Sequence, residues 1–294
     1  MYRKLMLFLA LTIAASGLLG AARPALAEQP VTVKLEFDFL RQGSAGVIML
    51  TGQNITGATA FVFGRGYPFF PVSQGFACLM SVSIYAQIKD YPMNIVIDTK
   101  DGTSTTWEGS LKVAEGQFIT ETPFVMPSDK RYLLRDDVQQ SEDAKLLSTY
   151  SLVTQTKYWD GPFTMPANAG LGSPFGSWRS YSGAGGVNRR HTGYDLRAGS
   201  GTPVLASANG RVVFSGWLDI HGYNIIIDHG WGVYSEYAHL SQRYVVPGQF
   251  VLQGDVLGLS GNTGRSTGPH IHWEIAVNGN WVNPITFMQV KLPN

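Results

Sequence analysis

The sequence has only one cysteine, Cys78, among its 294 residues, and only 15% of its residues are charged. A single thiol cannot form an internal disulfide, so stability must come from core burial or from a bound metal. We expect Cys78 to be a small buried apolar side chain rather than a reactive thiol. The 22 Lys and Arg residues balance 21 Asp and Glu residues, and this net charge of +1 predicts no nucleic-acid partner.

An apolar run stands at the N-terminus, where Tyr2-Arg3-Lys4 precedes LMLFLALTIAASGLLG. The run is shorter than the roughly 20 residues of a membrane-spanning helix, and Ala25-Leu26-Ala27 fits a signal peptidase site. We therefore expect a signal peptide at residues 1–27, cleaved after Ala27; the alternative is an uncleaved membrane anchor. The mature chain is then exported to the periplasm or cell wall without stable membrane insertion. No cysteine follows the run, which excludes a lipid anchor on an N-terminal cysteine.

Glycine (34 residues), proline (15) and a 12% aromatic share are typical of short strands joined by tight turns. Residues 31–39 alternate apolar and polar side chains, which predicts a strand with one wet face. Asp101-Gly102 stands between two β-prone runs and predicts a hairpin turn. We therefore expect a mostly β protein, beginning with a β-sandwich-like domain at residues 28–130.

The composition changes after that domain. Residues 131–160 are rich in charge, and Asp136 and Asp137 favour a helix start, so we expect a helical connector with its helix from about 137 to 156. The glycine, proline and aromatic residues return after Trp159. This return predicts a second, β-sheet-rich domain at residues 161–294.

Histidine is absent from the first 190 residues, and all six histidines lie in the second domain: His191, His221, His229, His239, His270 and His272. Side chains two apart in a strand share a face, so His270 and His272 project together.

A straight strand would separate His191 from Asp195 by about 13 Å, so both can bind one ion only if the chain curls at Gly193. A catalytic zinc takes three protein ligands, which His191, Asp195 and one of the His270/His272 pair can supply.

The motifs RHTGYDL, EYAHLS and TGRSTGPHIHWE, in this order and spacing, resemble the lysostaphin/LytM-type zinc metalloendopeptidases, which cut peptidoglycan. The resemblance covers residues 171 to about 288. It implies one Zn²⁺ per chain held by His191, Asp195 and His272, with His239 and His270 as catalytic residues. It also implies a peptidoglycan peptide as substrate and a monomeric enzyme with a lysostaphin-type peptidase fold.

Three further side chains are candidates for supporting roles. Glu274 shares the strand face of His270 and His272 and either accepts a histidine N–H or is a solvated charge. Tyr181 resembles a tyrosine that donates a hydrogen bond to the developing oxyanion in some relatives. His229 lies close to the site by analogy, but a structurally satisfied core histidine is the alternative. His221 is expected in a loop.

Two other functions remain open from sequence. One is a secreted protease of glycine-rich proteins, and the other is a non-catalytic wall-binding or regulatory module with a structural metal site. The presence of His239 and His270 argues against the second, because a structural site is closed by a fourth protein ligand. The substrate bond is equally open between cross-links from D-alanine to diaminopimelate, glycine bridges and amides within the stem peptide.

Overall fold

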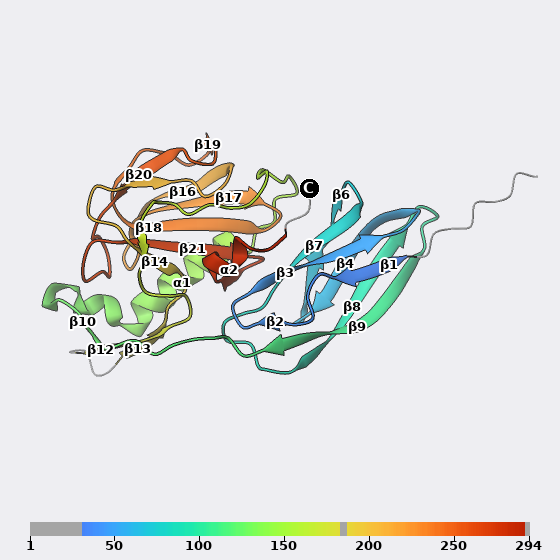
Figure 1. Ribbon diagram of the computed structural model, residues 1–294, viewed down its shortest axis with the longest axis horizontal. Coiled ribbons are helices and arrows are strands. Elements are labelled where there is room, and N and C mark those ends of the chain that lie inside the picture. The colour runs from blue at the N-terminus through green and yellow to red at the C-terminus, as the bar shows by residue number, and fades with distance from the viewer. Residues whose placement is uncertain (1–30, 183–186, 292–294) are drawn as a thin grey trace, which may run out of the picture.

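The computed structural model describes residues 31–182 and 187–291, so the expected signal peptide lies outside the described residues. Strands dominate this part of the chain (Figure 1), which confirms the mostly β fold class. Within it, no helix has the length and apolar character needed to cross a bilayer.

The N-terminal part consists of strands in two sheets, of order β1-β3-β7-β6 and β2-β9-β8-β4-β5. These strands are β1 (Thr32–Leu35), β2 (Leu40–Arg41), β3 (Ala45–Thr51), β4 (Ile55–Val62), β5 (Arg65–Pro68), β6 (Phe70–Val72), β7 (Gly75–Ser81), β8 (Asp90–Thr99) and β9 (Ser104–Ala114). Apolar side chains of both sheets, among them Ile48, Met80 and Ile95, pack into one core. Cys78 is fully buried in this core, as its sequence context predicts.

Of the two local predictions for this part, the structure confirms the hairpin and shortens the first strand. β8 and β9 pair antiparallel around Asp101-Gly102, and Gly102 has φ +82°, a conformation that glycine favours. The strand expected at residues 31–39 ends earlier, at Leu35. It ends there because the chain crosses to the other sheet, where Leu40 pairs with Val113.

The segment between β9 and β11, called the connector from here on, contains β10 (Phe124–Val125), the 3₁₀ helix η1 (Ser128–Leu134) and α1 (Asp136–Tyr150). α1 begins at the acidic pair, where negative charge stabilises a helix N-terminus. It ends six residues before the expected position 156. The following segment is held by the second domain instead, since the backbone and ring N–H groups of Trp231 donate to the carbonyls of Thr154 and Gln155.

The C-terminal part is built on a large sheet whose central strands are β14, β21 and β18. Its elements are β11 (Gly170–Leu171), β12 (Trp178–Ser182), β13 (Val187–Arg190), β14 (Tyr194–Arg197), β15 (Pro203–Leu205), β16 (Gly210–Leu218), β17 (Gly222–Gly230), β18 (Val233–Arg243), β19 (Phe250–Val251), β20 (Val256–Ser260), β21 (Ile271–Val277), β22 (Asn280–Val282) and α2 (Pro284–Phe287). β12 and β13 form a separate small sheet with β10. The connector therefore contributes a strand beside the peptidase-like sheet.

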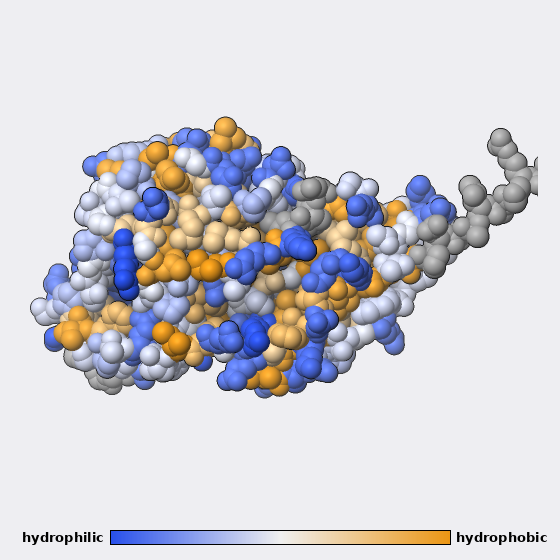
Figure 2. Space-filling model, in the orientation of Figure 1, coloured by the Kyte–Doolittle hydropathy of each residue, from blue (hydrophilic) through white to orange (hydrophobic). Residues whose placement is uncertain are grey.

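The two parts share one hydrophobic core. Phe70 of β6 stacks on Trp231 with ring centroids 4.7 Å apart, and Val47 and Leu79 belong to the same cluster as the large sheet. Ser81 Oγ donates to Val277 O at 2.7 Å across the junction. In the space-filling view the two parts meet along a continuous surface on which hydrophilic and hydrophobic residues are interspersed (Figure 2). The N-terminal part is therefore packed onto the second domain rather than tethered to it.

The shared core predicts one cooperative unfolding transition. Phe70→Ala should lower the free energy of unfolding by about 3–5 kcal/mol, in a single transition seen by both circular dichroism and tryptophan fluorescence in urea. The control Phe61→Ala removes a ring that is 47% exposed and should change the free energy by less than about 0.5 kcal/mol. Two separate transitions, of which Phe70→Ala moves only one, would contradict the shared core.

A candidate metal centre and active site

His191 and Asp195 are brought together by a curl of the chain between β13 and β14. His191 Nε2 lies 3.0 Å from Asp195 Oδ1, far closer than a straight strand would allow. Gly193 stands inside the curl, where an added Cβ would lie 2.6 Å from Trp273 O and 2.7 Å from the His272 ring. A side chain at position 193 would thus collide with the neighbouring strand, so glycine is required here by the close approach of β21.

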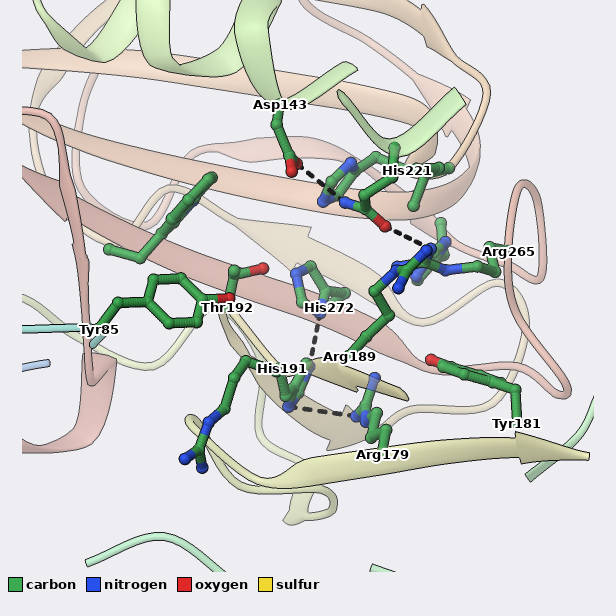
Figure 3. A pocket seen from close by; sticks show the side chains of 15 residues that line it. Tyr85, Asp143, Arg179, Tyr181, Arg189, His191, Thr192, His221, Arg265 and His272 are labelled. Atoms are coloured by element: carbon green, nitrogen blue, oxygen red, sulfur yellow. Dashed lines mark hydrogen bonds between the residues drawn. The ribbon is translucent and has the colours of Figure 1, made fainter. Parts of the chain in front are cut away.

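Strand register adds the third side chain. Asp195 of β14 pairs with His272 of β21, and His272 Nδ1 lies 2.9 Å from both Asp195 Oδ1 and His191 Nε2. Figure 3 shows the His191 and His272 rings pointing toward one another. The three predicted ligand residues therefore converge on one point, with all three side chains buried.

The hydrogen bonds of the two rings fix which nitrogens face that point. His191 Nδ1 lies 2.9 Å from the Pro174 carbonyl, which can only accept, and 3.1 Å from Arg179 Nη2; the shorter contact favours a proton on Nδ1 and a lone pair on Nε2. His272 Nε2 lies 2.9 Å from Glu274 Oε1 and donates there, so Nδ1 faces Asp195. Burial lowers the pKa of His272, but its hydrogen bonds to Asp195 and Glu274 outweigh burial and raise it, so a proton and a cation would compete for Nδ1.

This donor set fits zinc. Two imidazole nitrogens and one Asp oxygen are the ligands of catalytic zinc sites, which leave a fourth position open. Burial alone would raise the pKa of Asp195, but Arg179 and His191 hold it well below its usual range, so the carboxylate is ionised. Arg179 Nη2 lies 2.5 Å from the other oxygen, Asp195 Oδ2, and orients the carboxylate.

His239 stands beside the ligand cluster in a strained conformation. It has φ +59°, which costs a non-glycine residue about 1 kcal/mol or more. Its Nδ1 donates to Thr263 O at 2.8 Å, so its Nε2 is unprotonated. Burial, with the nearby His270 and His272, lowers the pKa of His239 well below its usual value and keeps the ring neutral.

His270 completes the group. Its Nδ1 lies 2.8 Å from Gly268 O, and its Nε2 lies 3.6 Å from Asp195 Oδ1. The His239 and His270 ring centroids are 4.7 Å apart. The two histidines expected to be catalytic are thus adjacent to each other and to the three candidate ligands.

Glu274 and His221 form a layer beneath the ligands. Glu274 is buried and accepts from His272 Nε2, Thr192 Oγ1 and Trp281 Nε1, which agrees with the acceptor role expected for it. His221, expected only as a loop residue, lies in the turn between β16 and β17 with Nδ1 2.5 Å from Glu142 Oε1. Burial lowers the pKa of His221, but Glu236, Glu142 and Glu274 outweigh burial and raise it well above its usual value.

Because a protonated imidazole has no lone pair, His221 cannot serve as a ligand in that state. His221, His272 and Glu274 lie close enough for a second metal group. Glu274 Oε1 accepts from His272 Nε2 at 2.9 Å, so this layer orients His272.

A cavity of about 120 Å³ opens beside the metal centre. Three parts of the chain line it: Tyr85 from the N-terminal part, Gln139 and Asp143 from α1, and from the C-terminal part His191 in the curl before β14, with His239 and His272 on the large sheet. Figure 3 shows Tyr85, Asp143, His191 and His272 around it. Tyr181 lies on the same wall, on β12. Its position in the cavity is compatible with the expected contact to an oxyanion.

His229 is not brought into this cluster. Its ring nitrogens lie 2.8 Å from Asn209 O and 2.7 Å from Ser235 Oγ, and Phe163 packs against the ring. Burial lowers its pKa to about 4, so the ring is neutral. These contacts favour the core-histidine alternative over the supporting role.

Sequence reasoning missed Glu142 and Arg179. Glu142 acts from 79 residues away and lies in no motif. Arg179 ends the stretch SPFGSWR, which also resembles the family, but no role for its side chain follows from that resemblance. Glu142 is a buried acidic residue on α1. Its neighbours in the sequence do not indicate which group its carboxylate contacts.

Comparisons with known proteins identify the family of the region that carries this cluster. The family model of Peptidase family M23 matches residues 189–284. The DD-carboxypeptidase/endopeptidase Mpg of Neisseria meningitidis is 48% identical over 105 residues, which are 36% of this chain and 24% of that protein. The peptidoglycan DD-endopeptidase ShyA of Vibrio cholerae is 42% identical over 103 residues, 35% of this chain and 23% of that protein. The chain therefore spans about a quarter of the length of these curated relatives.

The similarity in fold extends over more of the chain than the similarity in sequence. A crystal structure assigned to the M23 peptidases from Pseudomonas aeruginosa covers 85% of this chain and 95% of its own, with a TM-score of 0.62 and 24% identity. That coverage includes the N-terminal part as well as the large sheet. The resemblance to the lysostaphin-type family is confirmed: residues 189–284 of this chain form a peptidase family M23 domain.

Proposed function

We propose that this protein is an exported zinc endopeptidase that hydrolyses amide bonds in peptidoglycan peptides. The observation that carries the proposal is the convergence of His191 Nε2, His272 Nδ1 and Asp195 Oδ1 beside two further histidines, His239 and His270. The activities named for Mpg and ShyA support this substrate class. The N-terminal apolar run and Ala25-Leu26-Ala27 support export.

Different residues of the chain would bind the metal and transfer protons in the proposed reaction. When bound by His191, Asp195 and His272, zinc supplies the Lewis acidity that makes water a nucleophile at neutral pH. His239 and His270 each present an unprotonated Nε2, because their Nδ1 atoms are held by backbone carbonyls. One of them accepts the proton of the attacking water at Nε2, and the imidazolium so formed can then deliver that proton to the leaving amine as the amide C–N bond breaks.

Glu142 positions the catalytic group from the connector. Its carboxylate accepts from the backbone N–H groups of Ile220 and His221 at 2.8 and 3.0 Å. The carbonyl of His221 in turn accepts from the backbone N–H of His239 at 2.8 Å. This chain of contacts helps to hold His239 in its strained conformation. The connector is therefore part of the catalytic unit.

The non-catalytic alternative accounts poorly for this arrangement. A structural zinc needs a fourth ligand and gains nothing from a strained neutral histidine at its side. The glycine-directed protease remains a rival for the substrate only, since it would use the same machinery.

Digestion of purified sacculi by the mature chain tests the proposed function. Zinc-loaded protein should release soluble peptides, and mass spectrometry should locate their new amino termini at a peptide cross-link or stem amide. Intact sacculi after incubation, or release that is unaffected by removal of zinc with a chelator, would refute the proposal.

The division between ligands and catalytic histidines predicts opposite variant phenotypes. His272→Ala should lose zinc, because two ligands hold the ion poorly. His239→Ala should keep zinc and lose about 10²- to 10⁴-fold in turnover, the usual contribution of general acid–base catalysis. Metal content by mass spectrometry and single-turnover rates give the two readouts. Equal loss of metal in both variants would overturn the role assignment.

The role of Glu142 predicts a defect in turnover without loss of metal. Glu142→Ala should lower kcat about 10- to 100-fold, as expected for a misplaced catalytic group, while zinc content and KM change little. Glu142→Gln keeps one accepting oxygen and should recover part of the rate. Lys145→Ala, at an exposed position of the same helix, is the matched control. An unchanged kcat in Glu142→Ala would rule out the positioning role.

A further inference from the structure

Arginines gather around the cavity beside the metal centre. Four line it, namely Arg179, Arg189, Arg190 and Arg265, whereas Asp143 is the one acidic residue among the described lining residues. Figure 3 shows the three of them that it labels on the same side of the pocket, across from Tyr85. Since Lys and Arg nearly balance Asp and Glu over the whole chain, this local excess of positive charge is a feature of the site.

Two of these arginines have close partners in the structure, although the buried Nε of Arg179 has no hydrogen-bond partner among the described residues. Arg179 pairs with Asp195 at 2.5 Å and lies 3.7 Å from Glu121. Arg190 donates to Gly176 O at 2.9 Å, and its guanidinium lies over the rings of Phe118 and Trp178. These contacts indicate that the Arg179 and Arg190 side chains hold the walls of the site together.

Arg265 has only neutral acceptors among the described residues. Its Nη1 donates to Gln139 Oε1 at 2.6 Å and to Leu133 O at 3.4 Å. No acceptor in the described ranges engages its Nε or Nη2, although a guanidinium carries five N–H donors. Burial, together with repulsion from Arg179 and Arg189, lowers its pKa. An anion in this position would relieve that repulsion.

Arg189 is the second cation at the cavity, and besides its ion pair it donates to two neutral acceptors, from Nη1 to Asn188 O at 3.0 Å and from Nη2 to Leu134 O at 3.2 Å. Its carboxylate partner, Asp136, is 79% exposed, and exposed ion pairs are weak. The Nε of Arg189 is buried, and no hydrogen-bond partner for it exists in the part of the chain that the structure describes. Arg189 also stands two residues before the candidate ligand His191.

The position of Arg265 places its positive charge near the candidate catalytic residues. It lies in the loop between β20 and β21, five residues before His270, and its backbone N–H donates to Ile220 O at 2.8 Å. A group bound by its side chain would therefore lie near the bond being cut. Carboxylate is the anion that a peptide offers, and a guanidinium binds it with two parallel hydrogen bonds.

We propose that Arg265, assisted by Arg189, binds a free carboxylate of the substrate next to the scissile amide. In the structure Gln139 Oε1 stands at the guanidinium, where the incoming carboxylate would displace it. This inference rests on the proposed function and narrows its substrate class. It selects peptides with a free carboxylate beside the cleaved bond, as at a diaminopimelate residue, over glycine bridges, which offer none.

A pair of soluble cross-linked peptides that differ in one group tests the subsite. One carries the free diaminopimelate carboxylate beside the scissile bond, and in the other this carboxylate is amidated. The mature chain should show a kcat/KM about 10- to 100-fold higher for the free peptide, the usual range for charge-assisted hydrogen bonds. Arg265→Gln should bring the two peptides to similar values. Arg265→Lys should retain part of the preference, because it keeps the charge but loses the bidentate geometry.

Arg211→Gln is the matched control, because Arg211 is an exposed arginine on β16 whose side chain donates to Gly248 O. It should keep the full preference, and thermal melting should show that the Arg265 variants are folded. Equal cleavage of both peptides by the unmodified chain, or a preference that persists in Arg265→Gln, would overturn the subsite.

Failure of the proposed function gives a different result, since neither peptide is then cleaved. Calorimetric binding of the two peptides to the full mature chain tests the subsite in that case. Tighter binding of the free peptide that is lost in Arg265→Gln supports the subsite, and equal affinities refute it.

Discussion

The structure depends on one electrostatic constraint: two imidazole nitrogens and an ionised carboxylate oxygen face one another in a buried site. The Pro174 carbonyl accepts from His191 Nδ1 and Glu274 accepts from His272 Nε2, so the other nitrogen of each ring faces the cluster. Such a cluster needs a proton or a cation at its centre, because unpaired buried acceptors are costly. The local fold of β14 and β21 serves to create this arrangement.

Side chains from several segments of the described molecule hold the candidate ligands and catalytic residues in place. Arg179 orients Asp195, Glu274 orients His272, and Glu142 reaches from the connector to the loop that carries His221. The N-terminal part contributes Tyr85 to the cavity wall and Phe70 to the shared core. Catalytic geometry in this chain is therefore a property of all three segments, although the family match covers only residues 189–284.

Much of this arrangement follows from local sequence. The spacing of His270 and His272 places both on one strand face, and Gly193 permits the curl that joins His191 to Asp195. These features depend on neighbours in the sequence, so periodicity and glycine geometry predict them. The hairpin at Asp101-Gly102 is predictable for the same reason.

The remaining features depend on contacts between distant segments. Glu142 meets His221 across 79 residues, and Arg265 meets Gln139 across 126. No local pattern encodes such pairs. The end of α1 is likewise set by Trp231, which holds the chain beyond Leu152 against the large sheet. The role of His221 was missed because a histidine in a turn looks solvated until its partners are known.

X-ray absorption at the zinc edge of the mature chain tests the central claim most directly. The account predicts zinc bound by two imidazoles and by oxygen alone at the remaining positions, one oxygen from Asp195 and one from solvent. A third imidazole, which would place His270 or His239 on the metal and close the open position, would contradict it.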